Sequence, residues 1–148
     1  MQISRSNSNT CGAYKYDNKK EINNFTKNVK TVLVIDDEVA LIEICEIMLE
    51  RLGHKVFKAN SGSEGLKLFE VYKNQIDLVI SDMYIPEVEG QEVFDDFRKI
   101  DHDIKILLSS GGLSNSDEEE VINKGFNGFI RKPYSMKSLS EKMAELLI

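Results

Sequence analysis

The sequence predicts an α/β fold, in which a doubly wound, five-stranded parallel sheet carries helices on both faces. From residue 31 onward, short apolar runs alternate with amphipathic segments, and no two apolar runs follow each other through a tight turn. Strands separated by helices cannot pair as hairpins and therefore run parallel, buried on both sides. A length of 148 residues with 41% hydrophobic residues is sufficient for one such domain.

The strands are predicted from apolar runs of three to five residues. The first, TVLVI, is unbroken and rich in β-branched residues, as expected of a strand that is buried on both faces. The others are bounded by turn residues or by a helical segment. The predicted strands are Thr31–Ile35, Lys55–Ala59, Leu78–Ile80 (ending at Ser81–Asp82), Ile104–Leu108 and Gly128–Ile130.

The helices are predicted from apolar residues that recur every three or four positions between these strands. Gly53 and Gly125 each follow such a segment and are predicted to stop it, and Ser135 is the predicted N-cap of the last helix. The predicted helices are Val39–Leu52, Ser63–Tyr72, Gln91–Ile100, Ser116–Asn123 and Ser135–Leu147.

Residues 1–28 are predicted to be a disordered tail or linker, and residues 31–148 the folded domain. The tail is rich in Ser, Asn and Lys and lacks a sustained apolar period. Residues 1–30 hold six basic and two acidic side chains, whereas the whole chain carries a net charge of −6. The folded part is therefore strongly acidic, which argues against nucleic acid as a partner. The basic tail is read as a solvated linker rather than as a binding segment.

The chain is expected to be cytoplasmic, with no membrane partner. It has no apolar run of the roughly 18–20 residues that span a bilayer, and its N-terminus lacks the apolar core of a secretion signal. Cys11 and Cys45 show no C-x-x-C or His-rich spacing, so both are expected to be reduced thiols.

Candidate site residues follow four of the five predicted strands. In doubly wound sheets, ligands bind beyond the carboxyl ends of the strands. The first strand is followed by Asp36-Asp37-Glu38, and the third ends in Ser81-Asp82. The fourth is followed by Ser109-Ser110-Gly111-Gly112, and the fifth by Arg131-Lys132-Pro133. The strand-end rule therefore brings three aspartates, serine hydroxyls and a lysine to one edge of the sheet.

Asp36, Asp37 and Asp82 would repel one another strongly at this edge. Raised pKa values, a bound cation, or both must compensate. Magnesium fits best, because it takes few carboxylates and keeps several waters. The plainer interpretation is that Asp36 or Asp37 caps the following helix. A pair of acids on one strand end with a third acid on another favours the metal site.

A carboxylate beside a cation can attack phosphorus and form an acyl phosphate, which makes Asp82 a candidate nucleophile. The metal and the Lys132 ammonium would neutralise the phosphoryl oxygens. The bond to Pro133 constrains the lysine, and a cis peptide there is one of two alternatives. Ser110 could donate to a phosphoryl oxygen or serve only as a turn residue, and the sequence leaves both open. Phe129 is either a core aromatic or a switching side chain.

Four motifs at these strand ends resemble the response-regulator receiver family of two-component signalling. They are VIDDE at Val34–Glu38, ISDMYIP at Ile80–Pro86, LLSSGG at Leu107–Gly112, and Lys132-Pro133. Each motif alone is weak, but four in order at matching strand ends are specific. The resemblance covers roughly residues 31–148 and implies the flavodoxin-like receiver fold.

The resemblance assigns the acceptor and the metal ligands. It implies that Asp82 is the phospho-acceptor and that Mg2+ is the cofactor. Asp37 matches the main magnesium-binding acid, which Asp36 assists through water. The backbone carbonyl of Tyr84 matches a further ligand.

The resemblance also assigns the phosphate-pairing lysine and the switch residues. Lys132 matches the lysine that pairs with the phosphoryl group. Ser110 matches the switch hydroxyl, with Ser109 as its rival, because Ser110 has the usual spacing to the lysine. Phe129 matches the switch aromatic, and it lacks the hydroxyl that many family members carry there.

By this resemblance the chain is a signalling switch rather than an enzyme, apart from its self-catalysed phosphorylation. A histidine kinase or histidine phosphotransfer protein is expected to donate a phosphoryl group from phosphohistidine to Asp82. The modified domain then changes its contacts with a downstream protein, and a phosphorylation-dependent dimer is one such outcome. No output domain is predicted after the last helix. The sequence leaves open a stand-alone regulator or a receiver segment of a hybrid sensor kinase.

Two rival functions are weaker. A magnesium-dependent phosphatase of the aspartyl-phosphate type needs an acid two residues after its nucleophile, and Asp82-Met83-Tyr84 lacks it. A degenerate receiver that acts only as a binding module would not need the acceptor, the acid pair and the lysine, all of which are present.

Overall fold

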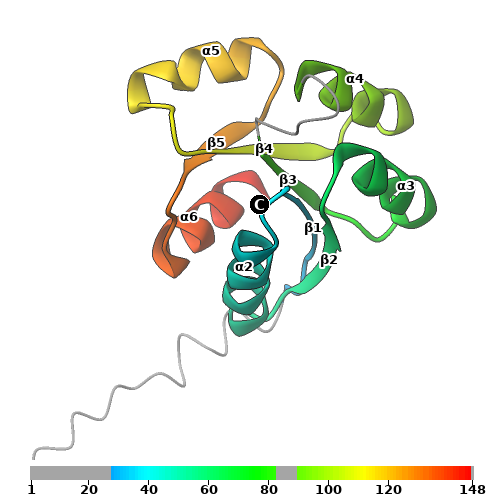
Figure 1. Cartoon of the computed structure of the whole chain (residues 1–148), viewed down its shortest axis with the longest axis horizontal. Coiled ribbons are helices and arrows are strands. Elements are labelled where there is room, and N and C mark those ends of the chain that lie inside the picture. The colour runs from blue at the N-terminus through cyan, green and yellow to red at the C-terminus, as the bar shows by residue number, and fades with distance from the viewer. Residues whose placement is uncertain (1–27, 83–89, 148) are drawn as a thin grey trace, which may run out of the picture.

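A computed structural model describes residues 28–82 and 90–147 (Figure 1). The predicted tail lies outside the described residues, except for residue 28. Five strands form one parallel sheet in the order β2-β1-β3-β4-β5. The strands are β1 Thr31–Ile35, β2 Lys55–Ala59, β3 Leu78–Asp82, β4 Lys105–Ser110 and β5 Gly128–Arg131. The predicted doubly wound sheet is confirmed, with its reversal of strand order between β1 and β3.

Helices cover both faces of the sheet, with α2 and α6 on one side and α3, α4 and α5 on the other (Figure 1). Their bounds are α2 Val39–Arg51, α3 Gly62–Tyr72, α4 Gly90–Ile100, the short 3-10 helix η1 Asn115–Asp117, α5 Glu118–Asn123 and α6 Met136–Leu146. No helix among the described residues is long and apolar enough to cross a membrane.

β3 ends at Asp82, as predicted, whereas β4 and β5 extend further toward their carboxyl ends than the sequence predicted. β4 begins at Lys105 and continues through Ser110, and β5 continues through Arg131. The apolar runs end earlier, but the ladder of β4 with β5 pairs Ser110 with Arg131. The predicted helix at Ser116–Asn123 was also partly wrong, because its first residues belong to η1.

Two buried clusters hold the helices to the sheet, because successive strand side chains point to opposite faces. Val32 and Val34 of β1 pack toward α2 and α6, whereas Leu33 and Ile35 pack toward α3 and α4. Each large apolar side chain buried in this way contributes roughly 1.5–3 kcal/mol.

Helix ends follow the predicted signals. Gly53 and Gly125 have φ values of 88° and 101°, a backbone region that glycine adopts without strain. At Gly125 a Cβ atom would also lie 2.9 Å from Phe94 Cζ, so the turn leaves no room for a side chain. Ser135 is confirmed as the N-cap of α6, where it forms a capping box with Ser138.

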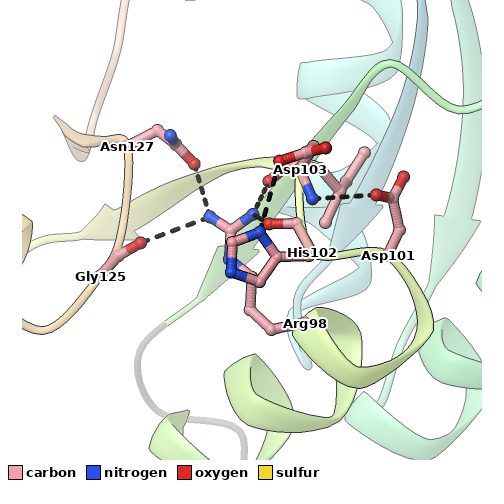
Figure 2. A network of polar contacts seen from close by, with 7 residues as sticks. Arg98, Asp101, His102, Asp103, Gly125 and Asn127 are labelled. Carbon is pink, nitrogen blue, oxygen red and sulfur yellow. Dashed lines mark hydrogen bonds and ion pairs between the residues drawn. The ribbon is translucent and has the colours of Figure 1, made fainter.

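Arg98, in the last turn of α4, fixes the end of the sheet opposite to the carboxyl ends of the strands (Figure 2). Its guanidinium donates to the carbonyl oxygens of His102 (2.9 Å), Ile104 and Gly125 (3.3 Å), and to Asn127 Oδ1 (2.8 Å). It also lies over the ring of Phe94, 5.0 Å from the ring centroid. The guanidinium therefore joins α4 to the start of β4 and to the turn before β5.

Candidate functional site

The carboxyl ends of the strands bring the predicted site residues to one edge of the sheet. The ladders pair Ile35 with Ser81 and Asp82 with Ser109, so the residues that follow β1 lie level with the end of β3. Lys132 follows β5 directly, and its backbone N–H donates to the carbonyl oxygen of Ser110 (2.9 Å).

Three carboxylates meet at this edge. Asp36, Asp37 and Asp82 each offer one oxygen, and these oxygens lie within 4.8 Å of one another. Asp36 and Asp82 are only 4% and 7% exposed, whereas Asp37 is exposed. Two negative charges are therefore held inside the protein, and a third is placed at the solvent boundary.

The ammonium of Lys132 bridges the two buried acids. Its Nζ lies 2.7 Å from Asp36 Oδ2 and 3.1 Å from Asp82 Oδ2. Burial lowers the pKa of Lys132, but the hydrogen bonds and charges of the two carboxylates outweigh this, so the pKa is raised. The lysine is therefore charged at neutral pH.

Asp36 also orders the start of α2, a role that the sequence left open as an alternative to metal binding. Its Oδ1 accepts a hydrogen bond from the backbone N–H of Glu38 (2.9 Å), at the entrance to α2. Its Oδ2 faces Lys132, so one carboxylate orders the start of α2 and also belongs to the acidic cluster.

The peptide bond between Lys132 and Pro133 is cis, which was one of the two alternatives for this bond. The segment that carries the lysine is partly buried, and Tyr134 beyond it packs against the core on the α2 and α6 side.

The predicted switch residues share the other face of the sheet. Ser110 is 1% exposed, and its Oγ accepts a hydrogen bond from the backbone N–H of Gly112 (3.2 Å). Phe129 is 5% exposed and belongs to the buried cluster beneath α3, α4 and α5. The rival Ser109 points to the opposite face, because side chains alternate along β4. Tyr84, the predicted backbone ligand, lies outside the described residues.

The donor set fits magnesium. Three carboxylates opposed by one ammonium leave a net charge of −2 in a small volume, which favours a divalent cation. All the donors among the described residues are oxygens, which is the preference of a hard ion such as Mg2+.

Sequence reasoning missed two neighbours of this site. Cys45 was interpreted only as a reduced thiol in a helix, and Tyr134 was not singled out. Cys45 belongs to the buried cluster beneath α2 and α6, and Tyr134 packs against that cluster. The sequence signal for Cys45 is its place in the apolar pattern of α2, whereas Tyr134 lies outside any helix or strand and is marked only by following Lys132-Pro133.

Known proteins resemble this chain over most of its length. The model of the response regulator receiver domain family matches residues 32–144. The sensor kinase CckA of Brucella abortus is 32% identical over 117 residues, which are 79% of this chain and 12% of that protein. The response regulator SaeR of Staphylococcus aureus is 28% identical over 116 residues, which are 78% of this chain and 50% of that protein. The chain thus spans half or less of the length of these curated relatives.

A solved structure with the same fold supports this match. The response regulator receiver domain protein of Clostridium thermocellum superposes with a TM-score of 0.74 at 28% identity, covering 80% of this chain and 94% of that one. The fold, the strand-end acids and the matched family model agree. The chain therefore belongs to the response regulator receiver domain family, a family of two-component signalling in which phosphorylation and magnesium dependence are general features.

Proposed function

We propose that this receiver domain accepts a phosphoryl group on Asp82 from a phosphohistidine and transmits the modification through protein contacts. The supporting observation is the Lys132 ammonium, which bridges Asp36 and Asp82 where three carboxylates meet. The oxygen of the proposed nucleophile, Asp82, lies 3.1 Å from the Lys132 ammonium, and a fixed positive charge at this distance supports a role in phosphoryl transfer.

In the proposed reaction, a carboxylate oxygen of Asp82 attacks the phosphorus of a phosphohistidine. The new O–P bond forms as the N–P bond breaks, and the electron pair of that bond stays on the imidazole nitrogen, which takes up a proton. Lys132 stays protonated throughout and stabilises charge on the phosphoryl oxygens.

Magnesium would be held by Asp37, Asp36 and Asp82, together with the backbone carbonyl of Tyr84. When bound, the ion neutralises negative charge on the phosphoryl group and on the carboxylates. Asp37 suits the main role, because it alone of the three aspartates is exposed and open to a hydrated ion.

The proposed switch uses Ser110 and Phe129. The Ser110 hydroxyl accepts from Gly112 in this state, and it can donate its own proton to a phosphoryl oxygen. Such a bond would draw the loop inward and allow Phe129 to repack beneath α5, shifting the face formed by α5, β5 and α6. Both states would exist before phosphorylation, and a full reversal of their ratio needs roughly 5.5 kcal/mol.

The proposed donor is a histidine kinase or a histidine phosphotransfer protein, and the proposed target is a downstream protein in the cytoplasm. Residues 31–148 would form the receiver unit and residues 1–28 a linker. One relative is named a sensor kinase and another a response regulator, and in both the matched region is half or less of the protein, so a receiver unit within a larger protein is the arrangement that these relatives favour.

Intact-mass spectrometry with a small phosphodonor such as phosphoramidate tests the proposal. With magnesium, the chain should gain one phosphoryl group, and EDTA should prevent the gain. Asp82→Asn should remove the gain, whereas Asp103→Asn, which alters an exposed acid beside His102, should retain it. A wild-type chain that no phosphodonor or phosphohistidine protein can modify would refute the proposal.

A further inference from the structure

The entrance to β1 is held by two side chains as well as by the neighbouring strands. The backbone N–H of Lys30 donates to His54 Nδ1 (3.1 Å), and the backbone N–H of Thr31 donates to Asp77 Oδ2 (2.8 Å). The carbonyl oxygen of Lys30 accepts from the backbone N–H of Lys55 (2.9 Å). Since β1 begins at Thr31, the preceding chain joins the sheet at this point. One of the bonds at this junction therefore depends on a titratable ring.

The bond from Lys30 requires a neutral imidazole. A ring nitrogen that accepts a hydrogen bond carries no proton, so the proton of the neutral His54 ring is on Nε2. When the ring gains a second proton, both nitrogens become donors, and Nδ1 can no longer accept from Lys30. Two N–H groups would then face each other where the bond now lies. Protonation of His54 therefore removes this bond rather than weakening it.

The surroundings of the ring favour its neutral form. Burial lowers the pKa of His54 from its ordinary value of 6.5, the Lys30 ammonium lowers it further, and the Asp77 carboxylate opposes both effects without cancelling them. Arg51 and Lys55, which are near His54 in the chain, are exposed. The side chains of α6 that line the cavity beside the ring do not titrate in this range: Ser140, Met143 and Ala144. The ring is therefore neutral at neutral pH, and it gains its second proton below pH 6.5.

A cavity of about 120 Å3 lies at this junction, lined by Asn28, Lys30 and His54 together with residues of α6. His54 is only partly buried, so a proton from solvent can reach the ring. Asn28 and Val29 are exposed, so the two backbone hydrogen bonds of Lys30 carry much of the attachment of residues 28–30 to the domain.

We propose that His54 is a pH-sensitive anchor of this junction, which holds residues 28–30 on the sheet when the ring is neutral and releases them when it is protonated. The strand β1 stays paired from Thr31 onward. Release adds three residues to the connection between the preceding chain and the domain, which is at most about 10 Å. This role of His54 does not depend on phosphorylation of Asp82.

The test is a pH titration of the whole chain followed by NMR. The ring signals of His54 give its pKa, and amide hydrogen exchange, corrected for the intrinsic pH dependence of the rate, gives the protection of the Lys30 amide. The protection of the Lys30 and Lys55 amides should fall about tenfold as the pH falls through the His54 pKa, because a hydrogen bond of the junction is lost. The Asp77 amide, which donates to the carbonyl oxygen of Thr31 (2.8 Å), should keep its protection.

Two substitutions of His54 separate the acceptor from the charge. His54→Asn places a carboxamide oxygen near the position of Nδ1, where it can accept from Lys30 but does not titrate, so the Lys30 amide should stay protected throughout the titration. His54→Leu removes the acceptor, so the protection should be about tenfold lower even at neutral pH.

His102→Asn is the matched control, because the chain has two histidines and His102 is exposed beside Asp103. It should keep the pH dependence of the wild type at the Lys30 amide.

Protection of the Lys30 amide that stays constant through the His54 pKa would overturn the proposal, as would a pH dependence in His54→Asn equal to that of the wild type. A simultaneous loss at the Asp77 amide would also overturn it, because the sheet would then open as a whole rather than at the junction alone. If His54→Leu does not fold, the wild type and His54→Asn still decide the question.

Discussion

The ammonium nitrogen of Lys132 lies 2.7 Å from a carboxylate oxygen of Asp36, although the two residues are 96 positions apart in the chain. They follow β5 and β1, which are separated in the sheet by β3 and β4. The lysine therefore reaches across the carboxyl edge of the sheet and contacts Asp82 on the way. One cation thus connects both halves of the doubly wound sheet at the site where phosphorylation is proposed.

This contact makes a pH-dependent contribution to stability. The Lys132 pKa is higher in the folded than in the unfolded chain, so its contribution is complete below the unfolded value of 10.5 and is lost as pH rises through the folded value. Lys132→Met should lower the free energy of unfolding by about 1–3 kcal/mol at neutral pH, because it leaves two buried carboxylates without their cation.

Urea unfolding of both proteins at several pH values measures this difference, which should shrink above pH 10.5. Lys124→Met is the control, because it removes an exposed lysine that pairs with Glu120. It should lower the free energy of unfolding by less than Lys132→Met does, and this loss does not depend on the acidic cluster. A difference between wild type and Lys132→Met that stays constant through this pH range would contradict the account.

Asp37 should destabilise the protein without magnesium and stabilise it with magnesium. Asp37→Asn removes one of three clustered negative charges, so without a divalent cation the free energy of unfolding should rise by about 1 kcal/mol. The same change removes the best-exposed candidate ligand, so stabilisation by added magnesium should largely disappear.

Thermal unfolding with and without magnesium checks both parts. Glu43→Gln, which alters an exposed acid on α2, should respond to magnesium as the wild type does. If magnesium stabilises Asp37→Asn as much as the wild type, Asp37 is not a principal ligand.

Ser110 should be needed for the conformational response and not for phosphorylation itself. Ser110→Ala keeps the acids and Lys132 in place, so mass spectrometry should still show one added phosphoryl group. In the wild type, we expect the NMR signals of the Phe129 ring to shift on phosphorylation. In Ser110→Ala, these signals should stay near their positions in the unphosphorylated protein.

Ser140→Ala supplies the comparison, because Ser140 lies on α6 next to His54, at the other end of the sheet. It should retain both the added mass and the Phe129 response. A full Phe129 response in Ser110→Ala would remove the serine from the switch.

Arg98 should contribute to stability without taking part in the chemistry. Arg98→Lys cannot reproduce a planar guanidinium that donates to three carbonyl oxygens and to Asn127 (Figure 2). We expect a loss of about 2 kcal/mol in the free energy of unfolding, because several partly buried acceptors lose their donor.

Chemical denaturation measures this loss, and Arg51→Lys, at an exposed position in the last turn of α2, should cost less than about 0.5 kcal/mol. Below its unfolding temperature, Arg98→Lys should still accept a phosphoryl group on Asp82. Loss of labelling in a folded Arg98→Lys protein would show that the hydrogen bonds of Arg98 affect the acidic cluster.

The sequence predicted the placement of Asp36, Asp82 and Lys132 because parallel strands bring their carboxyl ends to one edge. That rule depends only on the order of strands and helices, which apolar periodicity reveals. It could not predict which oxygen the lysine meets, nor that Asp36 also accepts from Glu38, because these depend on side-chain geometry. The extension of β4 to Ser110 was missed because its last residues are polar and their pairing partners are distant in sequence.

Arg98 and Tyr134 were missed for a different reason. A basic residue in the last turn of a helix is common, and nothing local indicates that Arg98 meets carbonyl groups some 27 residues away at Gly125. Tyr134 follows a recognised motif, but the buried cluster that it packs against is built from α2, α6 and the strands of the sheet. Contacts of this kind arise from tertiary packing, which a local pattern does not encode.

Chemical mapping of the phosphorylated residue tests the central claim most directly. After labelling with phosphoramidate and magnesium, reduction with tritiated borohydride converts an acyl phosphate into a tritium-labelled alcohol, and peptide sequencing locates it. We expect the label to appear at position 82 and to be absent in Asp82→Asn. Label at another acid, or a phosphoryl group that resists this reduction, would contradict the central claim.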